Sequence, residues 1–306
     1  MIMKQFKYIS NITTEELESN WVLPCINEDG FNSILIKNSV EKTVPIESST
    51  DNLNVKLNAV LLHNSKKFYF HIITSKRNDV VANAQFEVVY EYLFKKITES
   101  VLDSDLSNLI TSIEEYFKIS PDLNTKNLQI GVYGELLCIK ILYENGYHEI
   151  LEKYHNNFYS KHDVEISSKI RLEIKTTSTE KRIHSFKHNQ IHRDDVDVFV
   201  GSSIIETAQE GYSLFDLFEE IINLYPNPES KFSLEKLKQR CGVTNENKGI
   251  TAALEKAYCD YKFFDAKELP QLKEQIPNGV TSITYDVDCS LSNEISIDNL
   301  ITIFNK

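Results

Sequence analysis

The residues of this chain whose types and spacing could do chemistry lie in the stretch 170–177, which reads IRLEIKTT. Apolar and charged residues alternate in it, and this period of two predicts a β-strand with one buried face. The polar face carries Glu173 and Lys175 side by side. A carboxylate can ligate a hard cation, and an ammonium can stabilise anionic charge. The pair therefore indicates a site for a metal ion and a phosphate.

A second acidic residue precedes this strand. Residues 163–166 also alternate, and the polar pair at 168–169 suits a tight turn. The resulting hairpin would bring Asp163 near Glu173 and Lys175. Two carboxylates and a lysine on one sheet face are what metal-dependent cleavage of a phosphodiester requires.

Residue types alone leave alternatives open. Glu165 lies on the same strand face as Asp163 and would replace it if the register differed. The whole set could also be a surface hairpin with weak cross-strand ion pairs. A zinc-binding helical face is a further possibility, because His184, His188 and His192 are spaced by four residues, although no H-E-x-x-H motif is present.

A third acid lies in a helix expected over residues 125–145, with Gly146 as its C-cap. Gly131 and Gly134 lie inside this helix, where each glycine costs about 1 kcal/mol relative to alanine. Close approach of another backbone, or of a bound metal and substrate, would compensate for that cost. Glu135 is almost surrounded by apolar neighbours and is the candidate third acid.

Composition bounds the class of protein. The chain has 306 residues, 41% of them hydrophobic, and no apolar run reaches the ~18 residues that a membrane span requires. Five scattered cysteines without a C-x-x-C pair support neither a disulfide framework nor a zinc knuckle, so we expect a cytoplasmic protein. The net charge of −12 argues against non-specific coating of nucleic acid. However, residues 161–193 contain eight basic and four acidic residues, so this window could face phosphate.

The pattern of elements predicts an α+β (mixed α/β) protein in four parts. We expect a β-rich region over 1–80, a helical connector over 81–122, a core over 123–205, and a mostly helical region over 206–306 that ends in a strand. The core should run as a helix, a short strand near 148–153, the two strands of the hairpin, a helix near 185–192 and a strand at 196–200. Its order is therefore α-β-β-β-α-β.

This ordered set of motifs resembles the PD-(D/E)XK nuclease superfamily, which has the restriction-endonuclease-like fold. More narrowly, it resembles the bacterial family of PD-(D/E)XK motif-containing proteins, often encoded in restriction or phage-defence gene clusters. The resemblance covers most of the chain and is strongest over 125–205. One departure is His162, which stands where the superfamily has its name-giving proline. The matching pieces are G-x-x-G-E-L-L at 131–137, Asp163, E-I-K-T-T at 173–177, R-I-H at 182–184 with Gln190, and segments 276–280 and 283–287.

The resemblance implies roles for individual residues. Asp163 and Glu173 would be ligands of Mg²⁺, for which Mn²⁺ can substitute, and the carbonyl of Ile174 would be a third protein ligand. Lys175 would orient the attacking water and stabilise developing charge. Glu135 would hold a metal-bound water or a second ion, and Gln190 would touch the site or the scissile phosphate.

The resemblance therefore implies a Mg²⁺-dependent endodeoxyribonuclease of restriction-modification or anti-phage defence. Its partners would be DNA, a second copy of the chain in a homodimer, and methyltransferase or ATPase subunits of a defence system. The alternative is a DNA-binding or scaffolding subunit with a silent nuclease fold. Residues 234–244 resemble the first helix and turn of a helix-turn-helix, so DNA reading by the C-terminal helices is also open.

Overall fold

The computed structural model describes residues 7–8, 11–38, 44–98, 103–119, 125–154, 162–272, 279–280 and 282–306. The chain divides into two compact units, Met1–Ile119 and Ser120–Lys306. The helices expected as a connector over 81–122 thus belong to the first unit together with the strands. The expected core and C-terminal regions form one second unit.

In its described residues, the first unit has a six-stranded sheet and three α-helices. Its strand order is β1-β2-β3-β6-β5-β4, antiparallel throughout except for the parallel pair β1–β2. The strands and helices expected here from alternation and helical spacing are confirmed. Its elements are β1 (Lys7–Tyr8), α1 (Thr14–Ser19), β2 (Val22–Ile26), β3 (Asn32–Lys37), β4 (Ile46–Ser49), β5 (Leu53–His63), β6 (Lys66–Ser75), α2 (Val80–Lys96) and α3 (Asp103–Lys118).

The second unit is built on a four-stranded sheet of order β13-β10-β8-β7. In it β8 (Ile170–Thr177) runs parallel to β10 (Asp197–Ile204), whereas β7 (Val164–Glu165) and β13 (Lys262–Asp265) are antiparallel to their neighbours. Two smaller sheets pair β9 (Ile183–Lys187) with β14 (Thr284–Asp288), and β11 (Thr207–Ser213) with β12 (Thr251–Ala252). The helices are α4 (Thr125–Glu144), α5 (Ile150–Lys153), α6 (His188–Ile191), α7 (Leu214–Leu224), α8 (Pro228–Arg240), α9 (Leu254–Cys259) and α10 (Ile297–Phe304).

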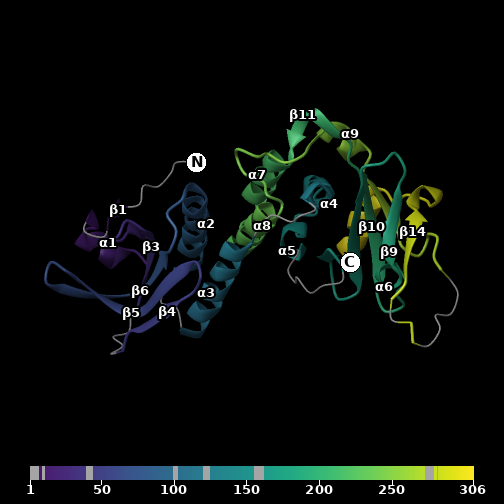
Figure 1. Ribbon diagram of the computed structural model, residues 1–306. Helices are drawn as coiled ribbons and strands as arrows, with labels where there is room; N and C mark the ends of the chain where they lie inside the picture. Colours follow the sequence, from purple (N-terminus) through teal and green to yellow (C-terminus); the bar gives the residue numbers. More distant parts are fainter. Residues whose placement is uncertain are drawn as a thin grey trace. The chain divides into compact units, whose positions relative to one another are not determined.

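Both faces of this sheet are covered. On one face, Leu172, Ile174 and Phe199 pack into a core with α4 and α7. On the other face, Val198 and Val200 pack against residues of β9, α6 and β14. Figure 1 shows α4, α5 and α7 on one side of β10, and β9, β14 and α6 on the other. The face of β8 that carries Glu173 was expected to be exposed to solvent. It lies under the β9–α6 layer instead.

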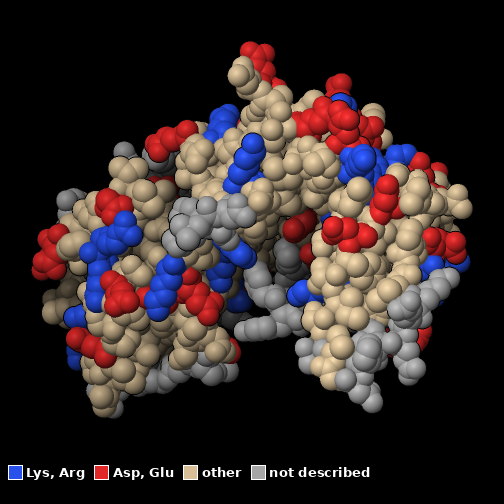
Figure 2. Space-filling model, turned by 45° about the vertical axis from the view of Figure 1, so that its right-hand side comes forward, with Lys and Arg blue, Asp and Glu red and all other residues tan. Residues whose placement is uncertain are grey.

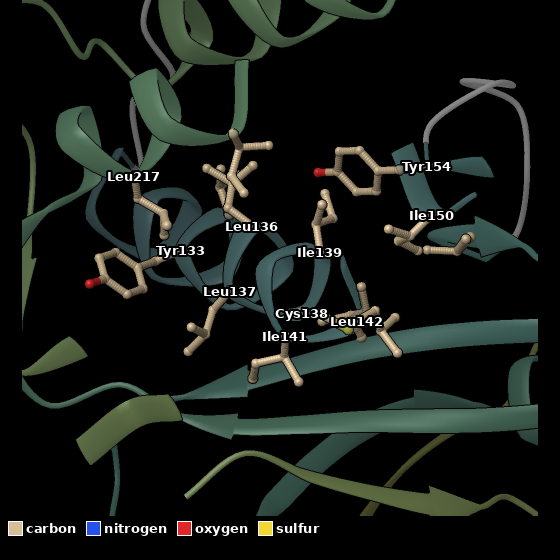
Figure 3. Packing of buried hydrophobic residues seen from close by; sticks show 14 of the residues in the cluster. Tyr133, Leu136, Leu137, Cys138, Ile139, Ile141, Leu142, Ile150, Tyr154 and Leu217 are labelled. Carbon is tan, nitrogen blue, oxygen red and sulfur yellow. The ribbon is translucent and has the colours of Figure 1, made fainter. Parts of the chain in front are cut away.

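Helix α4 is the centre of the helical layer. Figure 3 shows its Leu137 and Ile141 on the side of the strands, Leu136 near Leu217 of α7, and Ile139 on the side of Tyr154. All of these residues are buried. The burial of three sides of α4 explains why its sequence is apolar almost all round rather than along one stripe.

Several sequence-based assignments were wrong. The strand expected near 148–153 is helix α5, in which adjacent Ile150 and Leu151 are both buried, as one helical turn allows and an alternating strand does not. The helix expected at 185–192 is strand β9 followed by α6. Burial alternates along β9, but the buried His184 disguises the apolar period. The observed order is α4-α5-β7-β8-β9-α6-β10, which is the predicted order with α5 inserted and with β9 as its third strand.

The C-terminal region also differs from the expectation. It contains β11, β12, β13 and β14 besides its helices, and it ends in α10 rather than in a strand. Within this region, β12 is followed by α9. Residues 276–278 of the resemblance and Lys161 of the basic window lie outside the described residues. Within the described part of the chain, no helix is long and apolar enough to cross a bilayer.

Candidate active site

Glu173 and Lys175 point from β8 into the β9–α6 layer. The Glu173 side chain is only 3% exposed, and its Oε1 lies 2.8 Å from the Lys175 ammonium. The ammonium also lies 5.3 Å from the centre of the Phe186 ring of β9, a cation–π distance. The strand and its neighbouring layer thus hold the ion pair in one place.

Two further side chains donate to the Glu173 carboxylate. The Gln190 amide nitrogen donates to Oε1 over 2.8 Å, and the Gln190 carbonyl accepts from the Lys187 backbone N–H, which fixes the orientation of the amide. His162 Nδ1 lies 3.2 Å from Oε2. A buried carboxylate is tolerated only when it is paired and hydrogen-bonded, and these contacts supply both conditions.

Asp163 lies directly before β7, next to Glu173 of β8. The pairs Val164–Leu172 and Glu165–Arg171 set the register of the hairpin, which places Asp163 across from Glu173 when continued by one residue. Asp163 Oδ2 accepts the Ile174 backbone N–H over 2.6 Å. The predicted hairpin and its register are therefore present.

Glu135 approaches from α4. Its Oε2 accepts a hydrogen bond of 2.7 Å from the hydroxyl of Tyr154, which is bridged to Val164 of β7. Burial raises the pKa of Asp163 well above its usual range, and the Glu135 and Glu173 carboxylates raise it further. Asp163 is therefore close enough to each of the other two carboxylates for their negative charge to act on it.

Gly134 explains how α4 reaches the sheet. A Cβ atom on Gly134 would clash with Thr176 Oγ1 of β8 and would lie 2.5 Å from Ser203 Oγ of β10. At Gly131 a Cβ atom would meet nothing within 4 Å. A close approach is therefore present at Gly134, which immediately precedes Glu135, but it is made by side chains of β8 and β10 and not by another backbone; around Gly131 the space is open.

The donor set suits Mg²⁺. Among the described residues, no three His, Cys, Asp or Glu side chains form a ready-made metal cluster. Mg²⁺ does not need one, since it usually binds through one or two carboxylates and keeps several waters. A divalent cation would neutralise the charge that Glu135 and Glu173 place beside Asp163. The residues present therefore fit this ion.

The match to a family model spans most of the chain. The family described as "Putative PD-(D/E)XK family member, (DUF4420)" matches residues 7–290. The chain belongs to this family. No curated protein and no solved structure matches the chain.

The PD-(D/E)XK assignment agrees with the α+β architecture and with the motif on β8. It also leaves Glu165 without a role in the site, because this residue is exposed and pairs across the hairpin with Arg171. His162 and Tyr154 were missed by the sequence reasoning. The signal available for His162 was its position directly before Asp163, and the sequence held no signal for Tyr154.

The three histidines spaced by four do not form one metal face. His184 lies on β9, 4% exposed, with its Nε2 2.7 Å from Ser202 Oγ. His188 and His192 stack on each other at α6, with ring centres 4.5 Å apart. Because His184 belongs to a strand and points into the core, the three histidines do not share the helical face that suggested a zinc site.

Two other expectations about nucleic-acid contacts can be compared with the structure. Helix α8 is followed by strand β12 and not by a second helix after a short turn, so the helix-turn-helix expected from 234–244 is not formed. In the basic window, Arg193 pairs with Asp195 at 2.5 Å, and Arg171 lies 3.9 Å from Glu165. On the face drawn in Figure 2, basic and acidic side chains are interspersed.

Proposed function

We propose that this PD-(D/E)XK protein is a Mg²⁺-dependent endodeoxyribonuclease. The observation that carries the proposal is the Glu173 carboxylate, which contacts Lys175 and Gln190 at 2.8 Å each and lies beside Asp163, whose carboxyl is also within electrostatic reach of Glu135. Every side chain that the motif requires is present, and they converge on one end of the β7–β8 hairpin.

The chain's own residues would divide the work. Asp163, Glu173 and the Ile174 carbonyl would hold the ion, and Glu135 would supply a further carboxylate to it or to a second ion. When bound, Mg²⁺ would neutralise charge on the phosphate and make water a better nucleophile.

Lys175 and Gln190 would act on the substrate side. The Lys175 ammonium, 22% exposed in its side chain, can reach solvent and offset negative charge that builds on the phosphate. Its position over Phe186 limits the directions in which it can move. Gln190 would keep Glu173 in place through its amide N–H or touch the scissile phosphate.

DNA is the substrate that we propose, in restriction-modification or anti-phage defence. Cutting both strands takes two active sites or two visits, which makes a homodimer part of the proposal. Methyltransferase or ATPase subunits are the partners that a defence role implies. Mn²⁺ should replace Mg²⁺, because both accept oxygen ligands in octahedral geometry.

A cleavage assay with a matched lysine pair tests the proposal. Purified protein is incubated with supercoiled plasmid and Mg²⁺, Mn²⁺ or a chelator, as wild type, Lys175→Met and Lys169→Met. Lys169 is exposed at the hairpin turn and donates to the Asp195 carbonyl at 3.3 Å, so it controls for loss of one charge from the same hairpin. We expect metal-dependent nicking that Lys175→Met slows at least about 100-fold and Lys169→Met leaves nearly unchanged.

Equal cleavage by both variants would refute the assigned role of Lys175. DNA binding without cleavage, with either metal, would instead favour the second hypothesis of a DNA-binding or scaffolding subunit.

A further inference from the structure

His162 is a buried histidine whose ring meets the candidate metal ligand Glu173. The residue is 6% exposed, and its Nδ1 lies 3.2 Å from Glu173 Oε2. We infer that His162 is a positioning residue, which holds the Glu173 carboxylate in the orientation needed to bind the divalent cation. The inference rests on the proposed function.

The direction of the hydrogen bond follows from the chemistry of its partners. An ionised carboxylate only accepts hydrogen bonds, so the proton of this contact must be on Nδ1 of His162. Contacts with both Lys175 and Gln190 are made by the other oxygen, Oε1. The two oxygens of Glu173 are thus held from different sides.

The three donors come from three separate segments. His162 precedes β7, Lys175 belongs to β8, and Gln190 belongs to α6. With Oε1 held alone, the carboxylate could still turn about its last side-chain torsion, which is a soft one. The contact at Oε2 opposes that rotation. Groups that hydrogen-bond a metal ligand commonly change metal affinity 10–100-fold when they are removed.

His184 provides the comparison within the same chain. It is as deeply buried as His162, at 4% exposure, but its Nε2 contacts the Ser202 hydroxyl and no carboxylate. Replacing His184 removes a buried histidine at similar depth without touching the carboxylates.

The test is Mn²⁺ affinity of the full-length protein without DNA, measured by isothermal titration calorimetry. Asparagine carries its amide nitrogen as many bonds from the backbone as Nδ1, whereas leucine has the same branched shape without a donor. We expect His162→Leu to weaken Mn²⁺ binding about 10-fold or more. We expect His162→Asn to stay within about 3-fold of wild type, and His184→Leu to leave the affinity unchanged.

Equal affinities for the Leu and Asn variants of His162 would overturn the inference. If His162→Leu does not fold, His162→Gln replaces it, because this polar side chain places its amide one bond too far and should also weaken binding. Glu173→Gln separates the two claims. Unchanged Mn²⁺ affinity in Glu173→Gln refutes the proposed metal site, whereas lost affinity there with normal affinity in the donor-free His162 variant refutes only the role of His162.

Discussion

At the scale of single residues, the chemistry of this protein centres on one buried carboxylate. Glu173 is almost fully enclosed, yet three donors reach its two oxygens. The Asp163 carboxylate, directly before β7, accepts the backbone N–H of Ile174, the residue that follows Glu173 on β8. Strand β8 therefore carries Glu173 and, through its backbone, also holds Asp163, the two acids that we propose as metal ligands.

His184 gives a prediction of pH dependence at this scale. Its pKa is lowered to about 4, mainly by burial and in addition by the charges of Lys175 and Arg182, against an opposing effect of Asp288. Between pH 6.5 and 4 the unfolded chain binds a proton that the folded protein excludes, so stability falls as the pH falls through this window. Between pH 7.5 and 5 this group should remove about 2 kcal/mol from the free energy of unfolding.

Urea unfolding at the two pH values, for wild type and His184→Gln, measures this contribution. The variant should lose about 2 kcal/mol less than wild type on acidification. An identical loss in both proteins would show that His184 does not titrate as its surroundings require.

At the scale of elements, the site depends on how closely α4 approaches the sheet. Gly134 removes the Cβ that would clash with Thr176, and the neighbouring Glu135 then reaches the hydroxyl of Tyr154. The hairpin and the helix thus meet at the same end of β8.

The two glycines of α4 make a matched test of this approach. Gly134→Ala should destabilise the protein by about 1–3 kcal/mol, because overpacking against β8 and β10 outweighs the gain in helix propensity. Gly131→Ala, with open space around its Cβ, should be stabilising by up to about 1 kcal/mol. Chemical denaturation of the two variants provides the values, and equal stabilities would contradict the close approach at Gly134.

The sequence was sufficient to predict the strands and helices whose hydrophobic residues recur with a clear period. The hairpin with Asp163 across from Glu173, strands β3, β5 and β6 of the first unit and helix α4 all follow from alternation or from helical spacing. The pattern of elements also predicted the order of the core, and the ordered motifs indicated the family.

Tertiary contacts decided what the sequence could not show. His184 is polar but buried against Ser202. The alternation of β9 is therefore not visible in its residue types, and a helix was predicted there. Tyr154 and Glu135 are joined only after α4 and α5 fold together, and nothing in their spacing announces the contact. The polar face of β8 was predicted to be exposed. It is covered by β9 and α6, which come later in the chain.

At the scale of the whole molecule, the candidate site belongs entirely to the second unit. Every residue assigned to it falls between 120 and 306, and the two core clusters around the central sheet draw on residues of this unit alone. The first unit has its own core between its sheet and α1.

This division predicts that residues 120–306 fold without the first unit. The fragment should show a single cooperative urea transition and a dispersed amide NMR spectrum, because its buried apolar clusters remain complete. Absence of a cooperative transition would mean that the second unit depends on residues 1–119.

The most direct test of the account compares two glutamates of one hairpin. Glu173 is buried and contacts Lys175, whereas Glu165 is exposed and lies across from Arg171. The measurement is the rate of plasmid nicking with Mg²⁺ for Glu173→Gln and Glu165→Gln. Both variants are first shown to have similar thermal unfolding midpoints. The account predicts a loss of at least about 100-fold for Glu173→Gln and a rate within about 3-fold of wild type for Glu165→Gln. Wild-type nicking by Glu173→Gln would contradict it.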